Sequence, residues 1–212
     1  MNKKSFKLAA LFMSMLAMVT FSSCSDDDSP VKEEESGEVL KGSVTLENPG
    51  YGEDNWIYFS FSKGEVLNGI KEANRANDLT WDIAFYRYNV RTNGGLSGKG
   101  KGGAFDTEIT DFKAVTSVSN SKFTTDVMGE VTSSMSSFPP PSVKAPLNEV
   151  LGAALKFQGP PPTYTPNNHV YIVRTADGKY AKIQITGFYN DEGKSGHVQF
   201  TYAYQPDGSM NF

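Results

Sequence analysis

The residues that could carry chemistry are few in this chain of 212 residues. It holds one Cys, Cys24, and two His, His169 and His197. A single Cys cannot form an intrachain disulfide or a Cys-rich zinc or iron–sulfur site, and two His leave little for multi-His metal catalysis. Neither an HExxH nor a GxSxG motif occurs. The sequence therefore predicts a protein that is not an enzyme.

The two histidines lie in stretches whose alternation indicates β-strands. His197 shares a strand face with Gln199 and Thr201, so we expect it to face solvent. His169 shares a face with Tyr171, and its role stays open at this point. Nothing in the sequence indicates an acid–base pair around either ring.

A glycine-rich segment, GGLSGKGKGG at residues 94–103, resembles a phosphate-binding loop in part. Gly95, Gly100 and Lys101 have the required spacing, but Gly102 stands where the magnesium-binding Ser or Thr belongs. No long helical pattern follows. The segment is better interpreted as a turn between strands or as a site of close backbone packing.

Four cations surround this glycine-rich segment. If Arg87 and Arg91 lie on one strand, they share a face, because they are four positions apart. They form either an ordinary solvated strand face or a patch that contacts anions such as ligand carboxylates. The remaining two cations are Lys99 and Lys101.

Cys24 ends a pattern typical of a secreted lipoprotein. Three Lys in the first seven residues precede an apolar run at 8–21, which is too short to span a bilayer comfortably. The FSSC that follows resembles a lipobox, although Phe21 stands where Leu is usual. We expect a signal peptide at 1–23 and acylation of Cys24, with palmitate among the chains. The alternative is an ordinary signal peptide with an incidental Cys.

Residues 24–38 are expected to form an acidic flexible tether. Residues 25–38 hold seven acids and one Lys, with too little apolar area to fold. Ser-Asp-Asp-Asp at 25–28 resembles a signal that displays lipoproteins on the outside of the outer membrane in some Gram-negative bacteria. A merely solvated linker is the alternative. This segment carries a charge of −6, and residues 39–212 carry about −1 (16 cations and 17 anions), so the rest of the chain offers no basic surface for nucleic acid.

Residues 39–212 predict a single, mainly antiparallel all-β domain. Short alternating or β-branched runs recur between turn dipeptides, and only residues 64–77 indicate a helix or an irregular connection. The expected strands are 43–47, 56–62, 81–90, 169–174, 180–189 and 197–204. The last three are expected to form a meander joined by short turns.

Residues 133–168 hold two runs of three Pro, which cannot serve an interior strand ladder. We expect an irregular loop stiffened by polyproline geometry. Phe138, Phe157 and Tyr164 are large apolar groups in this segment, and stiff loops that carry aromatics often border binding sites. A floppy insertion is the alternative.

Several stretches resemble the HmuY family of haem-binding lipoproteins, in the right order through most of the domain. They are YFSFSKGEV (58–66), LTWDIAFYRYNVRTNGGLSGKGKGGA (79–104), TTDVMG (124–129), GPPPTY (159–164) and HVYIVRTADGKYAKIQIT (169–186). The resemblance implies a HmuY-like fold and a haemophore that is anchored to the outer membrane and faces the cell exterior. Such a protein takes haem from host haemoproteins and passes it to a TonB-dependent receptor for iron acquisition.

The resemblance also implies positions for the ligands of the haem iron. Founding members use two His, and relatives replace His by Met. Aligning GPPPTY puts Gln158 at the second axial position, and aligning TTDVMG puts the first near Met135. A thioether can bind haem iron, whereas an amide oxygen is a weak ligand. Met135 is therefore the candidate axial ligand. The side chains expected from position to pack the porphyrin are Phe138, Phe157 and Tyr164.

Two alternatives stay open. Gln158 and the lack of a usable His leave a HmuY-like module that carries another tetrapyrrole, an iron chelate or a partner protein. Met135 could also be a loop residue that packs under the Pro run, and Met128 is expected in the core.

Overall fold

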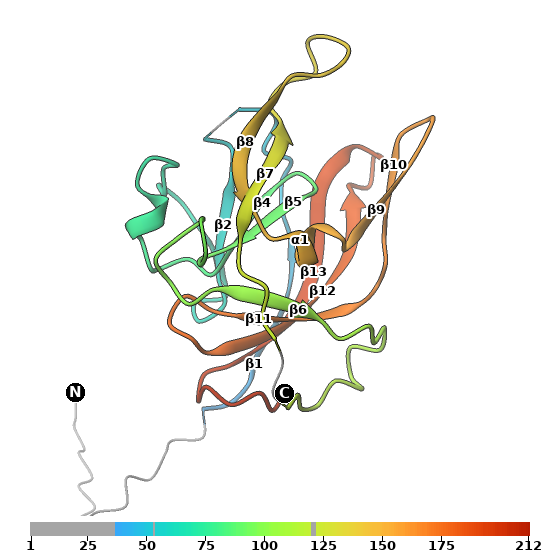
Figure 1. Ribbon diagram of the computed structural model, residues 1–212. Coiled ribbons are helices and arrows are strands. Elements are labelled where there is room, and N and C mark those ends of the chain that lie inside the picture. The colour runs from blue at the N-terminus through green and yellow to red at the C-terminus, as the bar shows by residue number, and fades with distance from the viewer. Residues whose placement is uncertain (1–36, 53, 120–121) are drawn as a thin grey trace, which may run out of the picture. The chain divides into compact units, whose positions relative to one another are not determined.

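Two antiparallel sheets and two separate hairpins make up the folded part of the chain in the computed structural model (Figure 1). The structure describes residues 37–52, 54–119 and 122–212. These residues belong to one compact unit. The expected signal peptide, Cys24 and nearly all of the acidic tether lie outside the described residues, so those expectations stay predictions.

The strands are β1 (Leu40–Thr45), β2 (Ile57–Ser60), β3 (Glu65–Leu67), β4 (Ile83–Tyr86), β5 (Asn89–Thr92), β6 (Gly103–Asp106), β7 (Val127–Thr132), β8 (Ser142–Leu147), β9 (Leu155–Gln158), β10 (Thr163–Pro166), β11 (Val170–Arg174), β12 (Tyr180–Tyr189) and β13 (Ser195–Gln205). The larger sheet has the order β1-β13-β12-β11-β6 and the smaller one β3-β2-β4-β5, with the hairpins β7–β8 and β9–β10 outside both. All these pairings are antiparallel. The expected all-β class is confirmed.

The expected C-terminal meander is also confirmed. Strands β11, β12 and β13 pair in sequence order, with Tyr171 opposite Ile183 and Ile183 opposite Tyr202. Gly178, in the turn after β11, has a φ of 97°, which glycine adopts without steric cost. Because side chains alternate along a strand, Tyr171, Ile183 and Tyr202 face the main core on one side of the sheet. Val170 and Ile172 face the other side, in a separate buried cluster.

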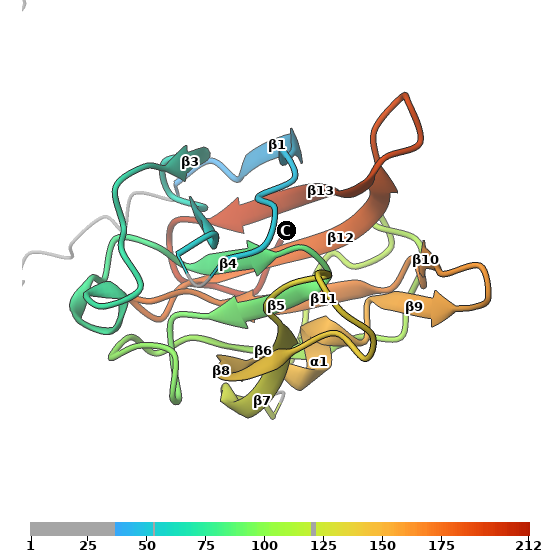
Figure 2. The same ribbon diagram turned by 90° about the horizontal axis from the view of Figure 1, so that it is seen from above.

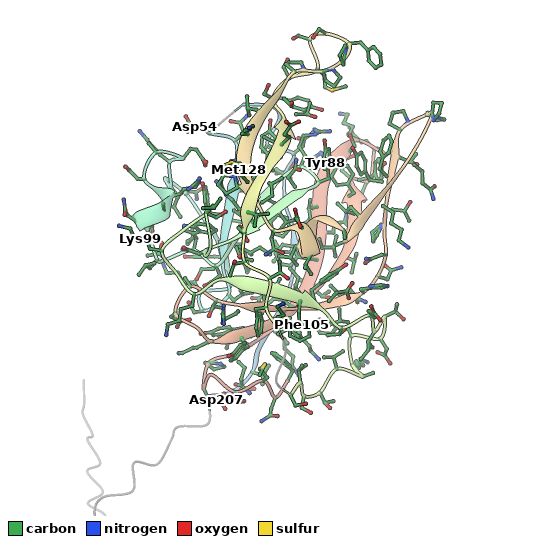
Figure 3. All side chains as sticks on the ribbon, viewed as in Figure 1. Asp54, Tyr88, Lys99, Phe105, Met128 and Asp207 are labelled. Carbon is green, nitrogen blue, oxygen red and sulfur yellow. The ribbon has the colours of Figure 1, made fainter. Side chains whose placement is uncertain are left out.

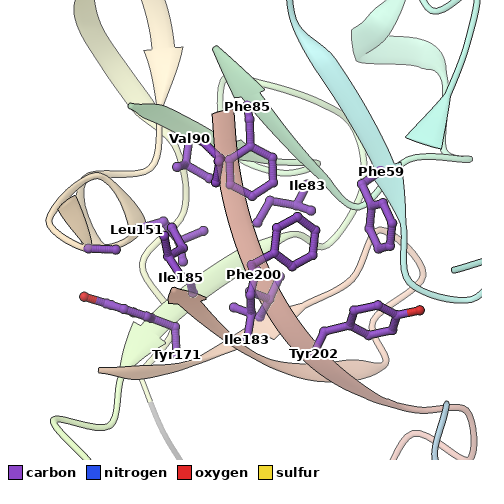
Figure 4. Close-up of a cluster of buried hydrophobic side chains, with 14 of the residues drawn as sticks. Phe59, Ile83, Phe85, Val90, Leu151, Tyr171, Ile183, Ile185, Phe200 and Tyr202 are labelled. Atoms are coloured by element: carbon purple, nitrogen blue, oxygen red, sulfur yellow. The ribbon is translucent and has the colours of Figure 1, made fainter. Parts of the chain in front are cut away.

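The main hydrophobic core lies between the two sheets (Figure 4). Phe59 and Phe85 come from the smaller sheet and Phe200 from the larger. The ring of Phe200 stacks on Phe85 at a centroid distance of 5.3 Å and meets Phe59 edge-on at 5.4 Å. Such pairs add about 0.5–1.5 kcal/mol each beyond the area they bury. Aromatic contacts therefore join the two sheets.

The other face of the smaller sheet is covered by the β7–β8 hairpin. Trp56, Trp81 and Tyr86 are buried there together with Val131 of β7. The Tyr86 hydroxyl donates a hydrogen bond to the carbonyl oxygen of Thr132 at 3.0 Å. The base of this hairpin is therefore fixed to the sheet.

The prediction of one strand over residues 81–90 is wrong. Strand β4 ends at Tyr86 and β5 begins at Asn89, and the two pair with each other across the turn formed by Arg87 and Tyr88. The sequence hides this turn because neither of its two residues is a Gly, Pro, Asn or Asp. The expectation that Arg87 shares a strand face with a second arginine fails with it.

The prediction of an irregular loop over residues 133–168 is also wrong. This segment contains β8, β9, β10 and the short helix α1 (Glu149–Gly152). The Pro runs themselves, at 139–141 and 160–162, lie in the turns of the two hairpins, where no ladder partner is required. Residues 64–77, expected to be helical or irregular, hold β3 and the 3-10 turn η1 (Arg75–Asn77).

The glycine-rich segment 94–103 packs closely against its own neighbours, as expected. A Cβ on Gly102 would lie 2.5 Å from the carbonyl carbon of Asn93. The side-chain nitrogen Nδ2 of Asn93 donates to the carbonyl oxygens of Asp78 and Trp81, at 2.8 and 2.9 Å. These glycines allow the backbone to fold around a buried asparagine, which explains them without a phosphate.

Candidate functional site

The two hairpins outside the sheets rise from the same end of the fold (Figure 1). The tip of β7–β8 comprises residues 133–141, and the turn of β9–β10 comprises residues 159–162. Viewed from above, α1 lies between the two hairpins (Figure 2). All five side chains that the sequence analysis assigned to a ligand site belong to these hairpins, so the structure gathers them at one end.

Apolar side chains at the β7–β8 tip lie in water. The exposed fraction of Met135 is 62% and that of Phe138 is 97%. The idea that Met135 packs under the Pro run is therefore wrong. Met128 is 52% exposed on β7, so its expected place in the core is wrong as well (Figure 3). A partner that covered the tip would remove this apolar surface from water.

The β9–β10 hairpin brings two of the predicted aromatics together. Tyr164 lies opposite Phe157 across the ladder, with ring centroids 5.4 Å apart. The backbone N–H of Tyr164 donates to the hydroxyl of Tyr189 at 2.8 Å, which ties β10 to the end of β12. Phe157 is 61% exposed, and Gln158 beside it is exposed too.

Tyr88 continues this aromatic contact toward the other hairpin, and the sequence analysis did not assign it to the site. Its ring stacks on Tyr164 with centroids 4.8 Å apart and planes at 14°. Its hydroxyl lies 3.3 Å from that of Thr132, at the end of β7. Tyr88 therefore contacts both hairpins, and Figure 3 shows it between them. We call Phe157, Tyr164 and Tyr88 the aromatic row.

The aromatic row also offers hydroxyl groups. Burial raises the pKa of Tyr164, and the neighbouring Tyr88 raises it further. Tyr164 is therefore protonated at neutral pH, and its hydroxyl can donate a hydrogen bond. The row presents one exposed ring, Phe157, beside two half-buried tyrosines that carry hydroxyls.

Arg91 is excluded from the expected anion patch. Its side chain is fully buried, and its guanidinium binds both carboxylate oxygens of Glu72, at 3.0 and 2.5 Å. Arg75 binds the same carboxylate at 2.7 Å, and the Trp56 ring lies 3.7 Å from the Arg91 guanidinium carbon. Burial favours a higher pKa for Glu72, but the two arginines outweigh it and hold the pKa below its usual value. Arg91 is therefore paired within the fold and does not face a ligand.

A small cavity lies beside Glu72, between the smaller sheet and the β7–β8 hairpin. Its volume is about 160 Å³, and its walls include Trp56, Tyr86 and Val143. Pockets for drug-sized ligands measure about 300–1,000 Å³. A tetrapyrrole therefore does not fit in this cavity.

Neither histidine lies on the two hairpins. His169 Nδ1 is 2.8 Å from a carboxylate oxygen of Asp106. His197 is only 9% exposed, and its Nδ1 lies 3.4 Å from Glu47. The prediction that His197 faces solvent is wrong, because its flank of β13 is covered. Each imidazole ring lies beside a carboxylate, and these contacts give both histidines a structural role.

The described part of the chain contains neither a metal-binding cluster nor a membrane-spanning helix. No group of three or more His, Cys, Asp or Glu in residues 37–52, 54–119 and 122–212 could hold a metal ion. None of the helices in these ranges is long and apolar enough to cross a membrane.

Comparisons with known proteins agree with this architecture. A family model described as HmuY protein matches residues 52–202, whereas no curated protein matches the chain. The apo HmuY analogue of Tannerella forsythia is 25% identical, with a TM-score of 0.65 over 81% of this chain and 99% of its own. A Bacteroides vulgatus protein described as a HmuY-like haem-binding protein is 25% identical, with a TM-score of 0.62 over 76% and 90% of the two chains. A Bacteroides fragilis protein described as a lipoprotein is also 25% identical, with a TM-score of 0.61 over 76% and 88%.

Proposed function

Because this chain belongs to the HmuY family, we propose that it is a haem-binding protein of the haemophore type, and not an enzyme. The proposal rests on the side chains at the end of the fold that the two hairpins form. The exposed Met135 and Phe138 lie at this end together with the aromatic row. A flat apolar ligand with a soft-metal centre suits this combination.

In the proposed complex the porphyrin lies between the hairpins. Met135 offers a neutral, polarizable sulfur to the iron from the β7–β8 side. Phe138 and the aromatic row cover the porphyrin faces and exclude water. Gln158 stands on the β9 side, where its amide oxygen is a weak ligand. With one good protein ligand, the affinity for haem is expected to be lower than with two His.

The setting of this binding protein is proposed from its sequence. A lipid on Cys24 holds it to the outer membrane, facing the cell exterior, and the acidic segment extends it from the surface. It takes haem from host haemoproteins and delivers it to a TonB-dependent receptor. The likeness to a Bacteroides fragilis protein described as a lipoprotein supports the anchor.

A haemin titration of residues 25–212 by visible absorption, in ferric and reduced states, tests this function. We expect a saturable complex with a sharp low-spin reduced spectrum, and we expect Met135→Ala to abolish that spectrum. Met128→Ala is the matched control, because this Met is also about half exposed but lies away from the tip, on β7. If Met135→Ala left a saturable complex unchanged, the protein would still bind haem, but Met135 would not be its axial ligand.

Gln158 favours a second candidate, a HmuY-like carrier of a tetrapyrrole other than haem. Neither described strand of the β9–β10 hairpin holds a His, Met or Cys. A metal-free tetrapyrrole needs only the aromatic row and no axial ligand. Protoporphyrin IX binding more tightly than haemin would support this candidate over the first.

A further inference from the structure

Arg87 is a cation at the end of the fold that carries the two hairpins, in the turn between β4 and β5. Among the described residues, no carboxylate forms an ion pair with it. The sequence analysis grouped it with Arg91 as a possible anion patch. Since Glu72 pairs with Arg91, Arg87 is the arginine of the two that keeps that possibility.

Neutral groups hold the Arg87 guanidinium in place. Its Nη1 donates to the side-chain oxygen of Asn48 at 3.0 Å, and its Nη2 donates to the hydroxyl of Ser195 at 3.3 Å. The Tyr51 ring lies 4.7 Å from its central carbon. Its Nε is buried and has no hydrogen-bond partner. These contacts orient the guanidinium without neutralising its charge, and they use only two of its five N–H donors.

Hydrogen bonds also fix the residues that contact Arg87. Asn48 accepts the backbone N–H of Gly50 at 2.9 Å and donates to the carbonyl oxygen of Ser195 at 2.9 Å. Arg87 itself has a φ of 54°, a conformation in which this kind of turn favours Asn or Gly. The turn alone does not explain an arginine here. A guanidinium fixed in advance loses little freedom when it binds an anion.

Arg87 adjoins the aromatic row. The next residue is Tyr88, which stacks on Tyr164. Burial is the largest influence on the pKa of Tyr164 and raises it, while the charge of Arg87 opposes that rise. The charge of Arg87 therefore acts on Tyr164, a member of the aromatic row.

We propose that Arg87 binds a carboxylate of the ligand carried on the aromatic row, which in haem is a propionate. The geometry of a guanidinium matches that of a carboxylate, which is the acid group that such tetrapyrroles carry. This inference rests on the proposed function and adds its specificity: the site selects tetrapyrroles with free carboxylates over neutral ones.

The first test uses the wild-type protein and four probes: haemin, haemin dimethyl ester, protoporphyrin IX and its dimethyl ester. Binding is followed by quenching of the fluorescence of the two Trp. Each free acid is expected to bind about ten-fold more tightly than its ester, as for one charge-assisted hydrogen bond. Because the comparison needs no variant, it does not depend on a variant's folding.

The second test uses Arg87→Gln, with Arg174→Gln as the matched control. Arg174 also lies over an aromatic ring, 4.9 Å from Phe123, and donates to a backbone carbonyl, but it ends β11. Arg87→Gln is expected to weaken binding of the acids about ten-fold and to leave ester binding unchanged. Arg174→Gln is expected to change neither.

The outcomes separate the two proposals. Equal binding of acids and esters by the wild type, or an equal loss of both in Arg87→Gln, overturns the carboxylate assignment and leaves haem binding intact. Arg87-dependent binding of protoporphyrin IX without haemin binding supports the assignment and rejects haem as the ligand. If none of the four probes binds, both proposals are overturned.

Discussion

Two arginines four positions apart in the sequence have opposite roles because of their surroundings. Arg91 is buried against Glu72, and its charge is used within the fold. Arg87 is held by neutral acceptors and keeps its charge for another partner. Residue type therefore indicated the chemistry available, namely a guanidinium, and the environment decided whether it serves stability or binding.

At the residue scale we predict that Glu72→Gln destabilises the protein by about 2–4 kcal/mol, because it leaves Arg91 buried without a counter-charge. The estimate is below that for a fully buried pair, since the Glu72 side chain is 27% exposed. Urea unfolding measures the change. Glu192→Gln is the control: it breaks an ion pair with Lys194 in which both side chains are about two-thirds exposed. Equal effects of the two substitutions would contradict the prediction.

At the element scale, the site depends on where the turns fall. The β4–β5 turn places Arg87 and Tyr88 at the end of the smaller sheet, where Tyr88 reaches both hairpins. Had residues 81–90 formed one strand, neither side chain could reach the site. The hairpins in turn owe their reach to Pro-containing turns, which end the ladders and leave Met135 and Phe138 exposed.

Removal of Tyr88, the end ring of the aromatic row, is predicted to weaken haemin binding. Tyr88→Ala should lower the affinity about three- to ten-fold, the equivalent of one aromatic stacking pair. Tyr88→Phe keeps the ring and loses only the hydroxyl contact with Thr132, so it should bind haemin nearly as well as the wild type. A titration of both variants decides the matter: similar losses would show that the hydroxyl, and not the ring, is what counts.

A further prediction concerns the glycine-rich turn. Gly102→Ala should destabilise the protein by about 1–3 kcal/mol, because its Cβ would lie 2.5 Å from the Asn93 backbone. Gly152→Ala is the matched control, since a Cβ in that helical position meets nothing within 4 Å. Chemical denaturation of both variants should show a loss in the first and little change in the second. An unaffected Gly102→Ala protein would mean that the backbone there can relax.

At the scale of the whole molecule, a buried carboxylate joins the two sheets. Asp82 accepts hydrogen bonds from the backbone N–H of Phe61 at 2.8 Å and of Ala176, in the turn after β11, at 3.0 Å. Burial raises its pKa from 3.8 to about 6, more than these hydrogen bonds lower it. The folded state therefore holds a proton on Asp82 more tightly than the unfolded chain does.

The pH dependence of stability follows from that difference. The contribution of Asp82 is fully present below about pH 4 and is lost as the pH rises through about 6, and its size is about 3 kcal/mol. Urea unfolding between pH 4 and 7 should show this trend, and Asp82→Asn should flatten it. Asp191→Asn, at an exposed turn position, is the control and should keep the wild-type slope. A slope unchanged in Asp82→Asn would assign the trend to other groups.

The sequence by itself determined the all-β class, the C-terminal meander, the close packing of the glycine-rich segment and the family resemblance. The first three features follow from local patterns, namely period-two alternation, turn dipeptides and glycine spacing, whereas the resemblance rests on matching stretches of sequence. It also indicated four of the side chains that the structure gathers at the hairpin end together with Met135. The sequence also indicated that the two Pro runs lie outside strand ladders, but it did not predict the hairpins around them.

Only the tertiary structure decided which groups meet. Tyr88 stacks on Tyr164, Arg87 binds Ser195 at a sequence separation of 108, and Glu72 neutralises Arg91. The burial of His197 and the exposure of Met128 were decided in the same way. The physical reason is that a local pattern specifies which face of a strand is apolar. What covers that face, and which charge finds a partner, depends on segments far away in the chain that packing brings together.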